Sequence, residues 1–389
     1  MKYHIALSRQ FDLDGIQRKA EMGLCPRHTM WILQQQLNAV VHQPDKTIVT
    51  RFDRLLARII GQPEHWALAR KLSSDLSSED LVVCAGEDIG LPLAILCALR
   101  GIRAKLVVMI MAPDRPRPKI LTKLLNWAKP IQLIMTNTQQ KADFLQQHLQ
   151  LADHEIFVYP EQTDAQFFNP GPMSADKQRP LIASAGLEQR DYRTLAAATQ
   201  DLDLDVRACA VSPNASAATR VAFPEVMPSN MVAQHYDWPD LRQLYRDADI
   251  VVVSLLYNHY SAGLTVLMEA MACKRPVVIT RTPGLASTLI DLGIVTGVEA
   301  EDPAGLKQAI LHLLNHPEVA AAQAQQAYEL FLEQFTSDGH VESIIAQLHG
   351  LEQRTALTPG DRPQPVGELP LMNGMNRLTQ RLKPYLKRT

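Results

Sequence analysis

The sequence predicts an α/β protein built from two doubly wound domains that face a central cleft. The chain has 389 residues, which is more than one domain of ordinary size contains. Short runs rich in β-branched residues alternate with helical stretches, a pattern typical of a parallel sheet covered by helices on both faces. The alternation stops at residues 169–180, a segment rich in Pro, Gly and charge, and then starts again.

The first series of elements predicts a domain over residues 1–168. Its first strand is expected in HIALS (4–8), and continuous apolar runs predict further strands at 81–84, 105–111, 132–136 and 156–160. Helical patterns occupy 92–101 and 139–150 between these strands.

The second series predicts a domain over residues 169–350. Strands are expected at 181–186, 206–211, 250–255, 276–280 and 294–298, and helices at 193–202, 239–249, 264–274, 284–293 and 302–317. In two such domains, ligands bind in the cleft at the carboxyl ends of the parallel strands.

The composition is that of an ordinary globular protein, with 46% hydrophobic and 21% charged residues and a net charge of −2. This charge gives no indication of a nucleic-acid partner. The five cysteines contain no C-x-x-C pair, which favours buried thiols in a reducing compartment. The first residues do not form a signal peptide, and no apolar run reaches the ~20 residues of a membrane helix. We therefore expect a cytoplasmic protein.

The end of the chain, residues 351–389, has a different character. Residues 358–370 are rich in Pro and Gly and predict a linker. Residues 371–389 place leucines and Met375 at helical spacing among Arg and Lys, as in a basic amphipathic helix that lies on an anionic membrane. The alternative is a frayed or docked terminal helix, weakened by Pro384. The first interpretation predicts a peripheral contact with the inner membrane face.

The stretch SAGLTVLMEAMACKRPVVITRTPGL (261–285) predicts a phosphate site. Gly263 ends a loop after an apolar strand, and Leu264 begins a helix with one apolar face. The free backbone N–H groups and the dipole of such a helix start favour an anion. Glu269, roughly two turns further on, would accept hydrogen bonds from a vicinal diol such as a ribose. The alternative is an ordinary helix with a surface Glu.

Several motifs resemble the family-4 glycosyltransferases of the GT-B fold (glycosyl transferases group 1). The stretch AGLTVLMEAMACKRPVV resembles their Gly-Leu…Glu-Ala-Met-Ala…Pro-Val-Val signature. Other matching stretches follow the family's order: PEQTDAQFFNP (160–170), SAGLEQRDYRTL (184–195), LYRDADIVVVSL (244–255) and VTGVEAEDPAGLKQAILHLL (295–314). The resemblance covers roughly residues 155–335, whereas the first domain matches only in its alternation.

The resemblance implies two Rossmann-like domains and a retaining transfer of a sugar from a nucleoside-diphosphate-sugar. The second domain would hold the nucleotide-sugar and the first the acceptor, which is a glycan, a lipid or a small molecule, as in polysaccharide biosynthesis. No cofactor or metal is implied. By position, Glu269 would bind the ribose and Arg190 the phosphates, and Gly186 would let its loop approach the nucleotide-sugar. The sugar or diphosphate would contact residues at the start of the helix, namely Ser261, Gly263, Leu264 and Thr265.

The chain departs from the family pattern in three places. In the first domain, the His often found after a strand has no counterpart, and Met111 and Asp114 stand there instead. Ser261 replaces the first Glu of the family's pair, so that Asn258 or His259 would have to supply the hydrogen bonds. Leu187 replaces a cation, and Arg193 or Lys274 would have to compensate. These departures keep open a non-catalytic nucleotide-sugar-binding or assembly protein. A second alternative, a nucleotide-sugar epimerase, requires acid–base groups beside the sugar.

Acceptor-side residues are expected in loops that follow strands of the first domain. Glu87 and Asp88 follow one strand, and either carboxylate is a candidate for acceptor binding. Asp88 is also assigned a catalytic role. The alternative is that Asp88 caps the start of a helix. The other candidates are Arg9, Asp12 and Asp114. Arg27 or His28 would steady an acceptor, or would belong to a surface turn.

Overall fold

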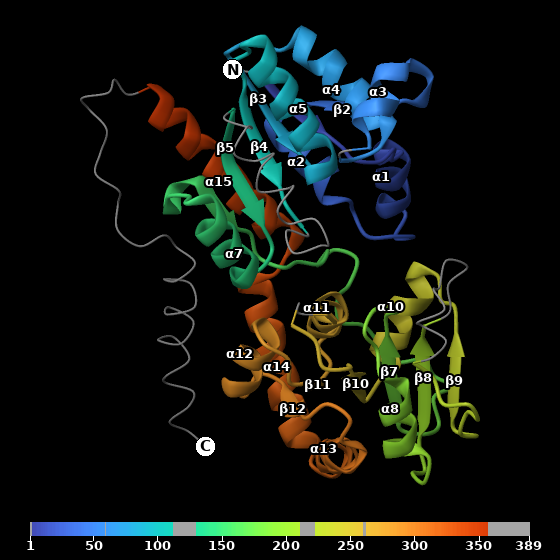
Figure 1. Cartoon of the computed structure of the whole chain (residues 1–389). Coiled ribbons are helices and arrows are strands. Elements are labelled where there is room, and N and C mark those ends of the chain that lie inside the picture. Colours follow the sequence, from blue (N-terminus) through green and yellow to red (C-terminus); the bar gives the residue numbers. More distant parts are fainter. Residues whose placement is uncertain (1, 59, 112–129, 211–221, 260–261, 357–389) are drawn as a thin grey trace. The chain divides into compact units, whose positions relative to one another are not determined.

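The computed structural model describes residues 2–58, 60–111, 130–210, 222–259 and 262–356. The chain divides into two compact units, shown in Figure 1. Among the described residues, unit 1 contains 2–17, 28–160 and 341–356, and unit 2 contains 18–27 and 161–340. Asp114, Ser261 and the tail 371–389 lie outside the described residues. No helix in the described part is long and apolar enough to span a bilayer.

Unit 1 has one parallel sheet of six strands in the order β2-β1-β3-β4-β5-β6. The strands are β1 (Lys2–Ala6), β2 (Val40–His42), β3 (Asp80–Cys84), β4 (Lys105–Met109), β5 (Ile131–Thr136) and β6 (Ile156–Val158). Every residue of β3 and β4 is buried, which is why these central strands are apolar runs in the sequence after their first residues, Asp80 and Lys105. The edge strand β2 has no such run and was not expected.

The helices of unit 1 include several that the sequence pattern did not predict. The long helices are α1 (Leu13–Glu21), α2 (Thr29–Leu37), α4 (Pro63–Asp75), α5 (Glu87–Arg100), α7 (Gln139–Leu149) and α15 (Ser337–Ala356), and the short ones are η1 (Lys46–Ile48), α3 (Arg51–Leu56) and η2 (Asp153–Glu155). Buried side chains of α4, α5 and α7 form one hydrophobic cluster with the sheet. α5 begins five residues earlier than the expected helix at 92, because Pro92 is accommodated inside it.

Unit 2 has a second parallel sheet of six strands in the order β12-β11-β10-β7-β8-β9. The strands are β7 (Leu181–Ala185), β8 (Asp205–Cys209), β9 (Met231–Gln234), β10 (Ile250–Val253), β11 (Val277–Thr280) and β12 (Thr296–Val298). Sequence order runs outward from β7 through β8 to β9 on one side, and from β10 to β12 on the other. The order therefore reverses between β7 and β10, which is where doubly wound sheets bind ligands.

Helices cover both faces of this sheet. They are α8 (Tyr192–Thr199), α10 (Trp238–Asp247), α11 (Leu264–Ala272), α12 (Leu285–Asp291), α13 (Pro303–Asn315) and α14 (Pro317–Gln334). α8 and α13 share one hydrophobic cluster with the sheet, whereas α10, α11, α12 and α14 share the other. This is the two-sided α/β architecture that the alternation predicts.

The chain passes from unit 1 to unit 2 at residues 160/161, ahead of the expected boundary at 168/169. Phe167 and Phe168 are buried in the hydrophobic cluster of α10 and α11, which assigns the aromatic motif to unit 2. At the other end, α15 continues to Ala356, past the expected end of the second domain at 350, and its residues from 341 onward belong to unit 1.

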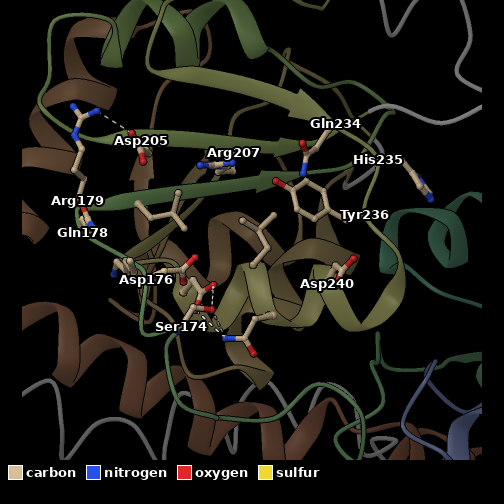
Figure 2. Close-up of a pocket in the computed structure, with 15 residues that line it drawn as sticks. Ser174, Asp176, Gln178, Arg179, Asp205, Arg207, Gln234, His235, Tyr236 and Asp240 are labelled. Atoms are coloured by element: carbon tan, nitrogen blue, oxygen red, sulfur yellow. Dashed lines mark hydrogen bonds and ion pairs between the residues drawn. The ribbon is translucent and has the colours of Figure 1, made fainter.

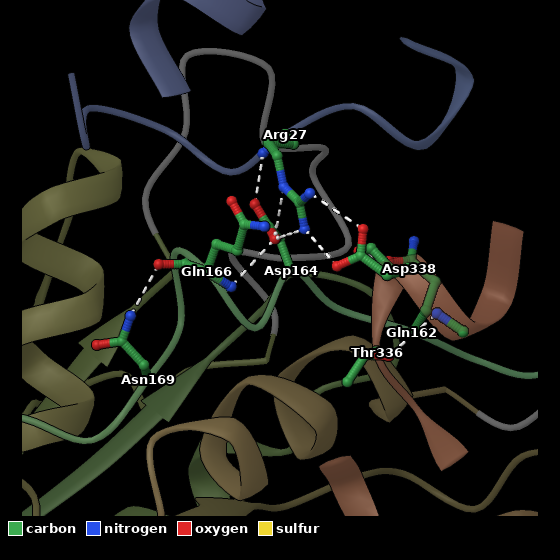
Figure 3. Close-up of polar contacts among 9 residues, drawn as sticks. Arg27, Gln162, Asp164, Gln166, Asn169, Thr336 and Asp338 are labelled. Carbon is green, nitrogen blue, oxygen red and sulfur yellow. Dashed lines mark hydrogen bonds and ion pairs between the residues drawn. The ribbon is translucent and has the colours of Figure 1, made fainter. Parts of the chain in front are cut away.

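Arg27 ties three distant segments of unit 2 together (Figure 3). Its guanidinium contacts Asp164 at 2.7 Å and Asp338 at 2.8 Å, and its backbone N–H donates to Asp164 at 2.8 Å. Next to this cluster, Thr163 and Thr336 pair as an isolated β-bridge. The expectation that Arg27 belongs to a surface turn is wrong, because its side chain is 12% exposed and pairs with two carboxylates. An acceptor contact of Arg27 stays a prediction.

Candidate functional site

Two loops meet at the carboxyl ends of β7 and β10, the strands between which the order of unit 2 reverses. The backbone N–H of Asp191 donates to the carbonyl of Ser254 at 3.0 Å, and the N–H of Leu256 donates to the carbonyl of Gln189 at 2.9 Å. The fold thus joins the predicted phosphate loop after β7 to the loop that leads into α11.

Arg190 lies inside this junction and is only 5% exposed. Its Nε donates to the carbonyl of Ala185 at 2.6 Å and its Nη1 to the carbonyl of Glu188 at 2.9 Å. Gly186 has φ +102°, and a β-carbon there would lie 2.1 Å from Nη2 of Arg190. The glycine therefore provides the space that the guanidinium occupies. Burial lowers the pKa of Arg190, but a guanidinium remains charged in proteins.

The second loop starts α11 in the manner that the sequence predicts. Gly263 is the N-cap with φ +88°, and a β-carbon there would lie 2.7 Å from a methyl group of Val253. Leu264 is buried in the core and Thr265 is exposed in the first turn. The free N–H groups at the start of this helix lie at the carboxyl end of the sheet, where an anion is favoured.

Glu269 is buried in unit 2 rather than exposed on its surface. It is 4% exposed, and its Oε2 accepts a hydrogen bond from the Tyr245 hydroxyl at 2.7 Å. Burial raises the pKa of Glu269 from 4.5 to about 7, against the opposing effects of the Tyr245 hydrogen bond and the Arg190 charge. The alternative of an ordinary surface Glu is wrong.

Tyr245 is a residue of the site to which the sequence pattern assigned no role. It is fully buried on α10, and its hydroxyl holds one oxygen of Glu269 in a fixed direction. Only its place in the LYRDAD stretch, at the helical spacing of a core residue, distinguished it in the sequence. Burial raises its pKa, so the hydroxyl remains the hydrogen-bond donor.

The residues considered as substitutes for the missing family groups have other tasks or other places. Asn258 is buried, donates to the Leu256 carbonyl at 3.0 Å and accepts from the Ala262 N–H at 3.2 Å, so it braces its own loop. His259 is exposed.

The two cations considered for the position next to Leu187 also differ in their placement. Lys274 follows the carboxyl end of α11, and α11 runs from the carboxyl end of β10 back to the amino end of β11. Lys274 therefore lies at the amino ends of the strands, whereas Leu187 follows the carboxyl end of β7. Lys274 cannot supply the positive charge that is missing at Leu187. Arg193 is exposed in the first turn of α8 and donates to the Phe223 carbonyl at 3.1 Å.

In unit 1, two candidate loops follow the neighbouring strands β1 and β3. A β-carbon at Gly86 would lie 3.3 Å from Oγ of Ser8, which shows how closely these loops approach. Glu87 accepts from the Met111 N–H at 3.1 Å, and Asp88 is exposed in the first turn of α5. Gly86 is the N-cap, so the alternative that Asp88 caps this helix is wrong.

The remaining acceptor-side candidates are less well placed for binding. Arg9 is exposed on the loop after β1. Asp12 accepts the Gly15 N–H at 2.9 Å and thereby caps the start of α1. His28 caps α2 by accepting the Met30 N–H at 3.2 Å.

A cavity of about 560 Å³ lies elsewhere in unit 2, over β8 and β9 beside α10 (Figure 2). Arg207 points into it from β8, and Gln234 and Tyr236 line it near the end of β9. Two of its charged groups pair with each other, since Arg179 contacts Asp205 at 3.0 Å. None of the expected nucleotide-sugar residues lines this cavity.

Comparisons with known proteins agree with this geometry. Residues 192–316 match the family model described as "Glycosyl transferases group 1". No curated protein matches the chain. Similar solved structures include a glycosyltransferase from Rickettsia africae, with 13% identity, a TM-score of 0.63 and coverage of 89% of this chain and 97% of that chain.

Two further solved structures have the same architecture. An α,α-trehalose-phosphate synthase (UDP-forming) from Burkholderia vietnamiensis has 12% identity and a TM-score of 0.65, with 92% of this chain and 98% of that chain covered. HepE from Anabaena, in complex with UDP, has 14% identity and a TM-score of 0.63, with 90% and 100% covered. Residues 192–316 thus form a glycosyl transferases group 1 domain, in a chain whose two units have the GT-B fold.

Proposed function

We propose that this protein is a retaining glycosyltransferase that transfers a sugar from a nucleoside-diphosphate-sugar to a glycan, lipid or small-molecule acceptor. The observation that carries the proposal is Glu269, a buried carboxylate held by Tyr245 behind the start of α11. A carboxylate on an ordinary helix would be expected on the surface, because burying it costs free energy. Recognition of a ribose diol gives this carboxylate a function.

Each group of the site has a proposed task. The carboxylate of Glu269 accepts the ribose hydroxyls, and the N–H groups at the start of α11 bind the diphosphate. Arg190 supplies positive charge where negative charge develops on the leaving nucleotide. In this proposal the leaving phosphate assists deprotonation of the acceptor, and no enzyme nucleophile, cofactor or metal is required. Unit 1 supplies the acceptor-side residues, with Glu87 and Asp88 as first candidates.

The solved relatives indicate which ligands to test first. HepE has been crystallised with UDP and with UDP-glucose, and the Burkholderia protein is described as UDP-forming. We therefore expect unit 2 to bind a uridine nucleotide, which is the ligand to test first.

A non-catalytic nucleotide-sugar-binding protein is a second candidate, favoured by specific observations. Leu187, where the family has a cation, packs against the hydrophobic cluster of α8 and α13. Asn258, a considered substitute for the family's first Glu, is committed to its own loop. A site with these losses would retain ribose and phosphate contacts and lose turnover.

Titration calorimetry with UDP, GDP and ADP, followed by hydrolysis assays with the matching nucleotide-sugars, separates the two candidates. Tight binding of one nucleotide with release of its sugar supports the transferase. Binding without release, even with mixed acceptors present, supports the binding protein. If no nucleotide binds, both candidates fail.

The tail 371–389, which lies outside the described residues, is proposed as a peripheral membrane contact at the inner face. Its removal should lower binding to anionic vesicles if this proposal holds. Unchanged binding would place the contact elsewhere in the chain.

A further inference from the structure

The short helix α3 of unit 1 is turned the opposite way from an ordinary surface helix. Its carboxylate Asp53 is 1% exposed, whereas Phe52 is 57% exposed and Leu55 is 55% exposed. Just before it, Ile48 is 37% exposed. A surface helix normally buries its apolar side and exposes its charges. The outward apolar side chains of α3 therefore require an explanation.

This orientation is fixed by hydrogen bonds. Thr50 and Asp53 form a reciprocal capping box at the start of α3. Arg70 of α4, which lies beside α3 in Figure 1, contacts both carboxylate oxygens of Asp53 at 3.2 and 3.0 Å. Arg70 also donates to the carbonyl of Ile48 at 3.0 Å. The buried anchor is thus polar, and it holds the apolar side chains away from the core.

Exposed cations alternate with these apolar residues along α3 and just after it. Arg51, Arg54 and Arg58 are all exposed. Between residues 46 and 58 the one acidic residue is Asp53, which is buried and paired with Arg70. The nearest acid before this segment, Asp45, caps the following turn through the Thr47 N–H at 2.8 Å. The surface is therefore strongly basic in a chain whose net charge is −2.

We propose that this α3 surface, made of Ile48, Arg51, Phe52, Arg54, Leu55 and Arg58, docks the protein on an anionic lipid bilayer. Apolar side chains that project between cations match the boundary between acyl chains and anionic headgroups. A protein partner would need roughly 800 Å² of complementary surface on each side with an apolar centre depleted in charge. Three arginines around three separate apolar side chains fit a bilayer better. The proposal does not depend on the nucleotide-sugar site.

The expected strength is modest and reversible. Each cation near an anionic membrane contributes about fivefold to the partition coefficient. Replacing both Arg54 and Arg58 with Ser should therefore lower vesicle binding by about 25-fold. Replacing Phe52 and Leu55 with Ser should lower it by at least about tenfold, because two inserted side chains lose their burial.

Co-sedimentation of the full chain with vesicles tests the proposal. One set of vesicles is pure phosphatidylcholine and the other mixes phosphatidylcholine with phosphatidylserine in equal parts. The two double variants, Phe52→Ser with Leu55→Ser and Arg54→Ser with Arg58→Ser, are compared with a matched control, Leu99→Ser with Arg103→Ser. The control removes an exposed Leu and an exposed Arg from the same unit.

The expected result is binding that requires phosphatidylserine, falls in both test variants, survives in the control and weakens with added salt. The proposal is overturned if the wild-type chain does not bind, or if both test variants bind like the wild type. It is also overturned if the wild type does not bind vesicles and is a dimer, and the variant Phe52→Ser with Leu55→Ser is a monomer. A second copy of the chain would then cover this surface. Thermal unfolding of each variant verifies its fold.

A direct contact with lipid can be measured in the same protein. Phe52→Trp should be quenched by brominated phosphatidylcholine in phosphatidylserine vesicles, beyond the quenching of the native tryptophans. Leu99→Trp, at a site 76% exposed in the same unit, should show no additional quenching. Equal quenching of the two variants would contradict insertion of α3.

Discussion

The raised pKa of Glu269 predicts that a neutral side chain at this position makes the protein more stable and the site weaker. Glu269→Gln keeps the size of the side chain and an oxygen that accepts from the Tyr245 hydroxyl. It removes the charge whose burial raises the pKa from 4.5 to about 7. That rise corresponds to about 3 kcal/mol, at about 1.4 kcal/mol per pKa unit.

The sign follows from proton linkage. Between pH 4.5 and about 7 the folded protein holds a proton on Glu269 that the unfolded chain releases. The contribution of Glu269 to the free energy of unfolding is therefore complete below pH 4.5 and is lost as the pH rises through 7. At about pH 8, Glu269→Gln should be more stable than the wild type by up to about 3 kcal/mol, and the difference should shrink toward about pH 5.

Urea unfolding followed by fluorescence at several pH values measures this difference, with a separate fit for each transition because the chain has two units. The control is Glu299→Gln, which removes a carboxylate that is 74% exposed and should leave stability almost unchanged. In calorimetry, Glu269→Gln should also weaken UDP binding by at least about tenfold, since a hydrogen bond to a charged group is lost. Equal stability of wild type and Glu269→Gln at both ends of the pH range would refute the reasoning.

Three other substitutions test the site and its support. Tyr245→Phe removes the hydrogen bond that lowers the pKa of Glu269, so nucleotide binding should weaken at neutral pH and recover at higher pH; a loss independent of pH would indicate a purely structural role. Arg190→Ala should weaken the binding of UDP, measured by calorimetry, much more than the binding of uridine. The control Arg193→Ala, at an exposed position, should change the binding of both ligands little. Equal losses for UDP and uridine in Arg190→Ala would mean that Arg190 acts only by holding its loop. Arg27→Ala leaves the buried Asp164 carboxylate without its cation and should lower the free energy of unfolding by about 3 kcal/mol, and an unchanged urea midpoint would contradict this.

The central strands and most helices of unit 2 could be predicted from the sequence because their signals are local, although α14 was not predicted. A strand buried on both faces, such as β10, must be apolar along its whole length. The edge strand β9 has exposed positions, so its residues Met231–Gln234 lack that pattern and were not predicted. The short helix α3 was missed for the opposite reason, because its apolar residues face outward.

The candidate site was predicted in part. The positive φ of Gly186 and Gly263 fits their expected roles, since glycine tolerates this backbone conformation without strain. The sequence also placed Glu269 on the right helix. It did not reveal that Lys274 lies at the amino ends of the strands, away from Leu187, since that depends on the direction in which α11 runs.

The sequence by itself determined the α/β alternation, the start of α11 and the position of its single carboxylate, because periodicity and glycine placement act over a few residues. Only the tertiary structure decided that Glu269 is buried, that Tyr245 holds it, and that Arg27 joins Asp164 to Asp338. These contacts link residues far apart in the chain, and they form only when the sheet order brings their elements together. The raised pKa of Glu269 has the same origin, since desolvation is a property of the packed fold.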